Sequence, residues 1–321
     1  MGDEPEEKIV VVDYDKLDED TGFKAVELDI WKAYEANVLA KPEDDRPDID
    51  AWVDEVAEEK KYDRKRVKFV ATMGIYAGPR DTFNQRTGSG KAYYGNGDLY
   101  DGEFLDGKKH GQGQYIFKKQ GKSECDKLVE KAFKAKPSDE STEAFVDRIA
   151  THLKIGAEIV RTMLEFGYYP CYHGDYIRGL RVGQGLMKHQ DGSVHKGDWA
   201  NNKPHGQGMR YYLNGDVYSG QWSEGLKHGY GTYRFANMAG EYRGEWQKGQ
   251  FAQGQWIQND GTYFEGTFEK KKGRPMDDQG VMHFANLNVA MDGVYKKNRW
   301  APLSAMRISD EAPAQDETWN A

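Results

Sequence analysis

The chain of 321 residues contains little cysteine and no long apolar run. Its two cysteines, Cys125 and Cys171, cannot build a disulfide framework, and so few thiols fit a reducing compartment. No stretch approaches the ~18 consecutive apolar residues that a membrane-spanning helix needs, and the mean hydropathy is -0.89. The first residues lack the basic start and the apolar core of a secretory signal. These absences argue against an integral membrane protein and a secreted protein, and they predict a cytoplasmic one.

Positive charge is also scarce, with 45 basic against 53 acidic residues and a net charge of -8. Residues 1–20 contain nine acidic side chains and only Lys8 and Lys16 as basic ones, so this segment carries -7 of the total. The rest of the chain is therefore close to neutral. Because a nucleic-acid binder needs a basic face, we expect no nucleic-acid partner.

Glycine and aromatic residues, in contrast, are both abundant, with 37 glycines and 13% aromatics. They recur in three consecutive segments, residues 172–194, 195–217 and 218–241, whose starts lie 23 residues apart, followed by the next start at 242. The shared frame is aromatic-x-Gly-x-aromatic, a basic Gly/His segment, and then Gly-x-Gly-x-aromatic. Further copies start at Tyr76, Tyr100, Tyr242, Phe264 and Met291, which makes about eight units.

Each unit is predicted to be one β-hairpin. Tyr218, Gly220 and Trp222 alternate at period two and so point to one face of a strand. A loop over Gly225–Gly229 would lead to a return strand with the same pattern. The glycines leave room for an aromatic ring of a neighbouring unit to lie over the backbone. With two strands and roughly 10 Å per unit, the pattern predicts an elongated, open antiparallel β-ribbon on the order of 80 Å long.

The units resemble MORN repeats, whose signature is Tyr-x-Gly-x-Trp-x-x-Gly-x-x-His-Gly-x-Gly. The similarity is carried by YDGEFLDGKKHGQGQYIF and YSGQWSEGLKHGYGTYRF and covers roughly residues 76–118 and 172–300. The histidine of the signature stands at His110, His205 and His228 but is replaced by Val182 in one unit. The fold class that the resemblance and the periodicity imply is mainly β, with stacked MORN hairpins.

Two regions lie outside the repeats. In the first, Phe23–Leu39 is expected to form a helix, and Asp48 is expected to cap another whose apolar stripe is Ile49, Trp52, Val53 and Val56. In the second, a helical hairpin over Cys125–Lys134 and Thr142–Glu165 interrupts the array. Each set of helices either packs on the sheet or docks on a partner. The domains predicted are an acidic tail with helices (1–75), first units (76–121), helical insertion (122–168), second array (169–300) and disordered tail (301–321).

No catalytic or cofactor motif is found. Gly90-Lys91 fails the phosphate-loop pattern at two positions, and none of five Gly-x-Gly pairs has the third glycine of a dinucleotide fingerprint. His205 and His228 occupy equivalent positions of adjacent units, about 10 Å apart by strand spacing, which is too far for one zinc ion. A role in stabilising the turn is expected for them instead. We therefore expect no catalytic residue, no cofactor and no metal.

The aromatic faces are the candidate binding surface, although many of these rings must also serve packing. A single layer cannot bury both faces, so part of one face should remain available for a helix or peptide. The candidate protein-binding residues are Trp52, Val56, Tyr100, Phe104, Trp199, Tyr218, Trp222, Tyr242 and Trp246.

The resemblance implies a non-catalytic structural component of a cytoskeletal assembly. Residues 88–117 look most like MORN subunits of the radial spoke head, which implies an axonemal location in a cilium or flagellum and axonemal partners, or a second copy of the chain. The alternative is an adaptor that binds phosphoinositides at a membrane surface through Lys270, Lys271, Lys272 and Arg274. An attached enzyme domain is not expected, because the segments flanking the repeats are short.

Overall fold

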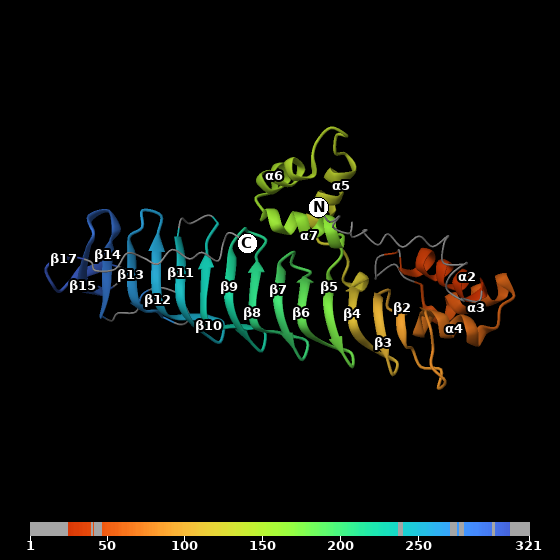
Figure 1. Ribbon diagram of the computed structural model, residues 1–321. Coiled ribbons are helices and arrows are strands. Elements are labelled where there is room, and N and C mark those ends of the chain that lie inside the picture. Colours follow the sequence, from red (N-terminus) through yellow and green to blue (C-terminus); the bar gives the residue numbers. More distant parts are fainter. Residues whose placement is uncertain are drawn as a thin grey trace, which may run out of the picture. The chain divides into compact units, whose positions relative to one another are not determined.

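The computed structural model describes residues 25–39, 41, 47–236, 240–269, 275, 279–296 and 299–308 (Figure 1). The chain divides into two compact units. Unit 1 comprises residues 1–149 and 158–194, and unit 2 comprises residues 150–157 and 195–321.

The N-terminal part of unit 1 is helical and is followed by strands. The helices are α2 (Ala25–Tyr34), the π-helical turn η2 (Glu35–Leu39), α3 (Ile49–Lys60) and α4 (Arg64–Met73). The strands are β1 (Ile75–Ala77), β2 (Gly88–Tyr93), β3 (Leu99–Leu105), β4 (Lys108–Ile116), β5 (Cys171–Ile177) and β6 (Leu180–Lys188). Between β4 and β5 lie η4 (Lys118–Gln120), α5 (Glu124–Lys134), α6 (Thr142–Leu153) and α7 (Ala157–Phe166). Strands that follow one another in this unit pair antiparallel.

Unit 2 begins within β7 and consists almost entirely of strands. They are β7 (Val194–Ala200), β8 (Lys203–Tyr211), β9 (Val217–Ser223), β10 (Leu226–Arg234), β11 (Gly240–Gln247), β12 (Gln250–Gln258), β13 (Tyr263–Thr267), β14 (Gln279–Phe284), β15 (Val289–Lys296), β16 (Arg299–Pro302) and β17 (Arg307–Ile308), with the short helix η5 (Ala285–Leu287). From β8 to β16 each strand pairs antiparallel with the next, and β17 pairs with β15. The predicted fold class is confirmed: the protein is mainly β, with antiparallel hairpins, N-terminal helices and a helical insertion.

The hairpin turns are shorter than predicted. Glu224 and Gly225 both have positive φ, 52° and 83°, and β10 starts directly afterwards at Leu226. Two central residues with positive φ match the right-handed twist of the flanking strands. The expected Gly225–Gly229 loop is therefore wrong, because Gly229 lies within the strand at a bulge, where the Tyr230 N–H donates to Gln221 Oε1 (3.0 Å).

The other connection, between successive hairpins, is a turn built on Asn-Gly-Asp. In unit 2 the Gly215 N–H donates to the Tyr212 carbonyl, and the Tyr212 N–H donates to the Asp216 carbonyl (both 2.9 Å). The Asn214 side chain accepts a bond from the Asp216 N–H (3.1 Å) and so holds the turn from within. Residues 94–98 of unit 1 repeat this turn with the same bonds.

A row of glycines crosses each set of strands, because glycines on neighbouring strands lie opposite one another. In unit 1 the row is Gly90, Gly102, Gly113, Gly174 and Gly185, and in unit 2 it is Gly208, Gly220, Gly231, Gly244, Gly254 and Gly266. A Cβ on Gly231 would lie 2.7 Å from Cζ of Tyr218 and closer still to its hydroxyl oxygen. The ring over these glycines is thus that of the same repeat, and not only that of a neighbouring one as predicted.

The neighbouring repeat also contributes a ring. The indole N–H of Trp246 donates to the carbonyl of Gly231 (3.0 Å), and that of Trp222 donates to the carbonyl of Gly208 (3.0 Å). The Tyr218 hydroxyl donates to the carbonyl of Gln221 (2.9 Å) in its own strand. The repeats that contain Trp222 and Trp246 are therefore each joined to the preceding one by ring packing and by a hydrogen bond to the backbone of a glycine.

The N-terminal helices pack on their own chain. Asp48 caps α3 as predicted and accepts a bond from the Ala51 N–H (3.3 Å). Trp52 and Val56 are buried in a core that α2, α3 and α4 share with Tyr93 and other residues of unit 1. This packing supports the alternative in which the helices bury their apolar faces within the protein.

The N-terminal helices differ from the prediction in two respects. The segment expected as one helix, Phe23–Leu39, is α2 up to Tyr34 and then a π-helical turn; Phe23 lies outside the described residues. The helix α4 was missed, although Asp63 caps it by accepting from the Arg66 N–H (3.0 Å). The strongly basic first turn of α4 hides the three buried positions that follow.

The helical insertion contains three helices rather than two. Helix α6 ends at Leu153 and Lys154 has a φ of 55°, so the predicted Thr142–Glu165 helix is broken in the middle. Strand β4 pairs with β5 across the insertion, with Gly113 opposite Gly174. The insertion therefore takes the place of one connecting turn and leaves the strand register intact.

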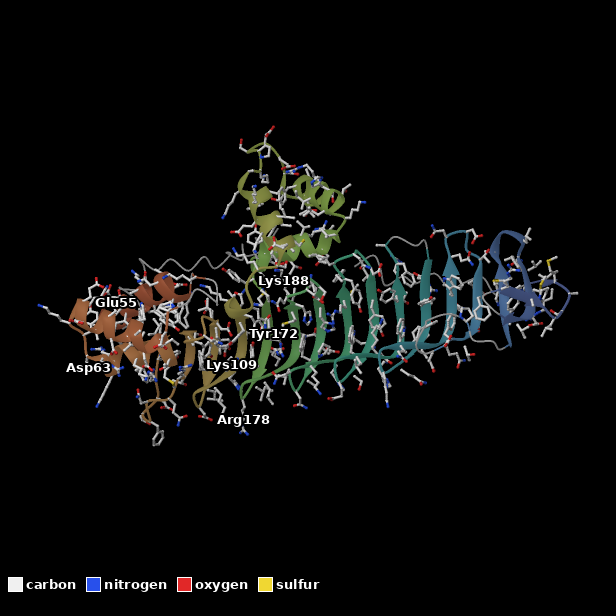
Figure 2. All side chains as sticks on the ribbon, turned by 180° about the vertical axis from the view of Figure 1, so that it is seen from behind. Glu55, Asp63, Lys109, Tyr172, Arg178 and Lys188 are labelled. Carbon is white, nitrogen blue, oxygen red and sulfur yellow. The ribbon has the colours of Figure 1, made fainter. Side chains whose placement is uncertain are left out.

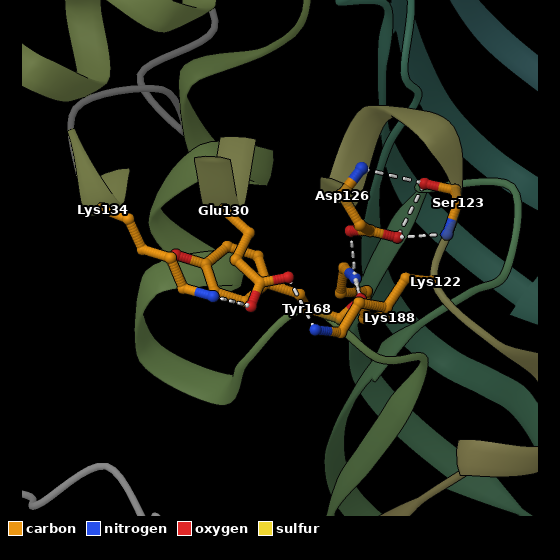
Figure 3. Close-up of polar contacts among 7 residues, drawn as sticks. All are labelled: Lys122, Ser123, Asp126, Glu130, Lys134, Tyr168 and Lys188. Atoms are coloured by element: carbon orange, nitrogen blue, oxygen red, sulfur yellow. Dashed lines mark hydrogen bonds and ion pairs between the residues drawn. The ribbon is translucent and has the colours of Figure 1, made fainter. Parts of the chain in front are cut away.

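A buried ion pair holds the insertion to strand β6 (Figure 3). Lys188 Nζ lies 2.5 Å from Asp126 Oδ1, both side chains are fully buried, and Lys188 also donates to the Tyr168 carbonyl (3.1 Å). The other carboxylate oxygen of Asp126 accepts bonds from the backbone and hydroxyl of Ser123, which caps α5. These contacts support packing of the insertion on the sheet.

Strand pairing also continues beyond the predicted end of the array at residue 300. Strands β16 and β17 extend it to Ile308, so the boundary predicted for the disordered tail is wrong. The acidic residues 1–20 and the segment after Ile308 lie outside the described residues. Among the helices that are described, none is both long enough and apolar enough to traverse a lipid bilayer.

Candidate functional site

Aromatic rings form a continuous chain of edge contacts along each unit. In unit 2, Tyr218 contacts Trp222 and Trp246, with ring centroids 5.2 Å apart in both pairs and interplanar angles of 88° and 79°. In unit 1, Tyr100 contacts Phe104 and Tyr176 in the same way. Edge-to-face pairs of this kind stabilise by roughly 0.5–1.5 kcal/mol beyond the area they bury. The rings thus give the hairpins a fixed spacing.

Most predicted binding residues belong to this packing. Buried side chains are Trp52, Val56, Tyr100, Phe104, Trp199, Tyr218, Trp222 and Trp246, each at most 4% exposed. Tyr242 is partly exposed and is the one predicted residue at an open surface. The candidate lipid-binding residues Lys270, Lys271, Lys272 and Arg274 lie outside the described residues.

A lysine lies within the ring layer of unit 2. Lys227 Nζ is 4.0 Å from the ring centroid of Trp246, 4.5 Å from that of Tyr233 and 5.4 Å from that of Tyr218. Burial lowers the pKa of Lys227 to about 8, and the nearby positive charge of Arg210 adds to this effect. The π faces offset part of the desolvation cost of an ammonium group. We call Lys227 and these three rings the lysine cage of unit 2.

Unit 1 contains the same arrangement around Lys109, which is labelled in Figure 2. Lys109 Nζ is 4.2 Å from the ring centroid of Tyr115, 5.2 Å from that of Tyr176 and 5.6 Å from that of Tyr100. Burial again lowers the lysine pKa to about 8, with Arg181 adding to the shift. The lysine cage therefore occurs in both units, at Lys109 and at Lys227.

Each cage is braced by an aspartate of the Asn-Gly-Asp turn. The Tyr233 hydroxyl donates to Asp216 Oδ2 (2.7 Å), and the Tyr115 hydroxyl donates to Asp98 Oδ2 (2.9 Å). Burial and the carboxylate raise the pKa of both tyrosines well above the ordinary value, so they stay protonated and keep donating. The turn, the ring and the lysine are in this way fixed relative to one another.

A cavity of about 340 Å³ opens over the cage of unit 2 on strands β10–β12. Its walls are mostly aromatic, with Tyr212, Tyr233, Phe235, Tyr242 and Phe251 around the Lys227 side chain. Tyr242 and Phe251 stack at 4.9 Å with an interplanar angle of 12°. We call this cavity the aromatic pocket. It presents apolar surface and one amine.

The cage residues are not among those predicted from the sequence. Lys109 and Lys227 belong to the basic Gly/His segment of the repeat, and Tyr115 and Tyr233 belong to its return strand. The signal was present, because both units combine the Lys-His-Gly segment with a tyrosine on the return strand and an Asn-Gly-Asp turn. Which rings converge on the amine depends on strand pairing.

The histidines of the repeat do not form a metal site. His205 and His228 are exposed and lie on strands β8 and β10, after the tight turns rather than in them. In the described part of the chain no three His, Cys, Asp or Glu side chains come close enough together to hold a metal ion.

Comparison with protein families agrees with the geometry. The family model of the MORN repeat matches residues 82–99, 100–122, 172–194, 195–217 and 218–237, together about a third of the chain. A comparison with curated proteins gives no match. Five MORN repeats are therefore present, and MORN is a non-enzymatic repeat family that points to a binding or scaffold role. Strands β11 and β12 continue the pairing beyond the matched segments, with Gly244 opposite Gly254.

Proposed function

We propose that the protein is a non-catalytic structural component of a cytoskeletal assembly, and that its strand array presents a rigid surface to protein partners. The observation that carries this proposal is the ring and glycine packing, which recurs from repeat to repeat and leaves the aromatic pocket open on a fixed backbone. A preorganised surface loses little entropy when it binds. The candidate site on this surface consists of the lysine cage and the aromatic pocket of unit 2.

The finer proposal is a subunit of the axonemal radial spoke head. The support is the resemblance of residues 88–117 to MORN subunits of that assembly. The partners would then be other radial spoke proteins, or a second copy of this chain, and the location would be the axoneme of a cilium or flagellum.

The proposed contact includes Tyr242 and the rest of the aromatic pocket. A stable interface covers about 800 Å² on each partner, so the pocket would be the centre of a larger contact. Several modest contacts on one rigid subunit combine through effective concentration into firm incorporation. The acidic residues 1–20 are not required by this proposal.

Retention of tagged variants in detergent-extracted axonemes tests the proposal. Tyr242→Ser should lower retention, while deletion of residues 1–20 should leave it largely intact. Tyr230→Ser is the matched control, because Tyr230 is 59% exposed and does not line the pocket. Loss of the 1–20 deletion variant from the axoneme would show instead that the acidic segment is the principal anchor.

The adaptor at a phosphoinositide membrane is the competing function. Pelleting of the full chain with anionic vesicles distinguishes it from the structural role. Strong pelleting that disappears when Lys270, Lys271, Lys272 and Arg274 are neutralised would favour the membrane adaptor.

A further inference from the structure

The aromatic pocket contains a charged side chain with which a ligand could pair. Among the described residues that line the pocket, Lys227 is the only charged one. The amine contacts rings and has no carboxylate within ion-pair distance in the described part of the chain. Burial lowers the pKa of Lys227, and the negative charge of Asp216 offsets this effect only slightly. The Asp216 carboxylate, however, already accepts bonds from the Tyr233 hydroxyl, the Asn214 amide and the Ala236 N–H. The pocket is therefore complementary to a ligand that combines an apolar ring with a carboxylate.

Residues 309–321 of the same chain have this composition. The segment contains Asp310, Glu311, Asp316 and Glu317, no basic residue, and one aromatic side chain, Trp319. Pockets that take a small ligand start at about 300 Å³, and the aromatic pocket, at about 340 Å³, can hold an indole ring with a neighbouring carboxylate at its rim.

The register of the strands brings the start of this segment to the correct end of the sheet. Ile308 lies opposite Val289, and Val289 lies opposite Phe284. On the neighbouring strands His283 lies opposite Tyr263, Tyr263 opposite Ile257, and Ile257 opposite Glu241. Because paired residues share a level across the sheet, Ile308 lies at the same end of the strands as Glu241, next to Tyr242, which lines the pocket.

The distance can also be spanned. From β17 to β10, the strand of Lys227, there are six strand spacings, about 29 Å at ~4.8 Å each. The nine residues from 309 to 317 reach about 30 Å when extended. Pocket and segment both belong to unit 2.

We propose that residues 309–321 bind in the aromatic pocket of their own chain, with Trp319 among the rings and Asp316 or Glu317 paired with Lys227. An ion pair would restore full protonation to an amine that burial disfavours in its charged form. Where the pocket serves a partner, which rests on the proposed function, the segment competes with that partner and regulates its access.

The reactivity of Lys227 tests this on the full-length chain. The protein is pulsed with sulfosuccinimidyl acetate at pH 8, and acetylation of individual lysines is quantified by mass spectrometry. In the variant Trp319→Ala, Asp316→Asn, Glu317→Gln, Lys227 should acetylate about tenfold faster than in the wild type, as expected for a segment that occupies its pocket about nine-tenths of the time. Lys248, exposed on a turn of the same unit, should react equally in all proteins.

The control variant Asp18→Asn, Glu19→Gln removes two acidic charges from the other end of the chain and should leave the rate at Lys227 unchanged. Equal rates at Lys227 in the wild type and the tail variant would overturn the proposal. An increase in the control variant would assign the pocket to residues 1–24, and protection that grows with protein concentration would assign it to a second copy; both overturn it. The purified protein contains no partner, so this result is independent of whether the axonemal role holds.

Discussion

Replacing Gly231 by alanine adds one methyl group at the point where the Tyr218 ring covers the glycine row. The new Cβ would lie 2.7 Å from Cζ and 2.8 Å from Cε2 of that ring. Tyr218 is fully buried between Trp222 and Trp246, so it cannot move aside without disturbing both contacts. The φ angle of Gly231 is not positive, so an alanine at this position fits the backbone without strain.

The cost can be worked out from two contributions. Overpacking of a well-filled core costs about 1–3 kcal/mol. Displacement of the ring breaks the hydrogen bond from its hydroxyl to Gln221, which costs about 0.5–1.5 kcal/mol more. Alanine regains roughly 0.5–1 kcal/mol of backbone entropy relative to glycine in a strand. The expected net loss is about 0.5–4 kcal/mol, measured from urea unfolding followed by tryptophan fluorescence.

A second variant separates ring overlap from a general effect of losing glycine. In the wild type, Tyr218→Phe should destabilise, because it removes the bond to Gln221. In the Gly231→Ala background the same change should be neutral or stabilising, because the bond is already broken and the hydroxyl is the atom nearest the new methyl. Additive effects, or wild-type stability of Gly231→Ala, would refute the packing described for the glycine row.

Three further outcomes are expected in urea unfolding experiments. Trp246→Phe should lower the free energy of unfolding by about 1–2 kcal/mol, since it removes the indole N–H that donates to the buried Gly231 carbonyl. A urea midpoint equal to that of the wild type would contradict this. Lys109→Met should raise the free energy of unfolding near pH 7, and this gain over the wild type should shrink as the pH rises from 8 to 10. The reason is that a lysine whose folded-state pKa is about 8 binds fewer protons in the folded than in the unfolded protein over that range. A gain that does not change with pH would contradict this reasoning. Lys188→Met should cost about 3–5 kcal/mol by leaving Asp126 charged and unpaired in a buried site, and Lys188→Met with Asp126→Asn should recover part of the loss.

The periodic part of the fold could be predicted from the sequence because the period-two pattern of Tyr218, Gly220 and Trp222 constrains every strand in the same way. The cap of α3 at Asp48 was predictable for a similar reason, since an acidic side chain before an amphipathic segment has one favoured role. Local signals of this kind need no knowledge of distant contacts.

The remainder depends on contacts between residues far apart in the sequence. The turn at Glu224 and Gly225 was misplaced because a non-glycine residue with positive φ leaves no trace in composition. The cage around Lys227 was missed because Trp246 reaches it only once β10 and β11 pair. Burial of Trp222 likewise follows from ring contacts along the array, so an aromatic pattern alone could not tell packing from binding.

The proposed function makes the protein a structural part of an axonemal assembly. The most direct measurement is to tag the full chain in a ciliated cell, extract radial spokes from demembranated axonemes with salt, and separate them on a sucrose gradient. The proposed function predicts that the tagged chain sediments with the spoke particles in constant ratio to their other subunits. Recovery of the chain entirely in the detergent-soluble fraction, with none on the axoneme, would contradict it.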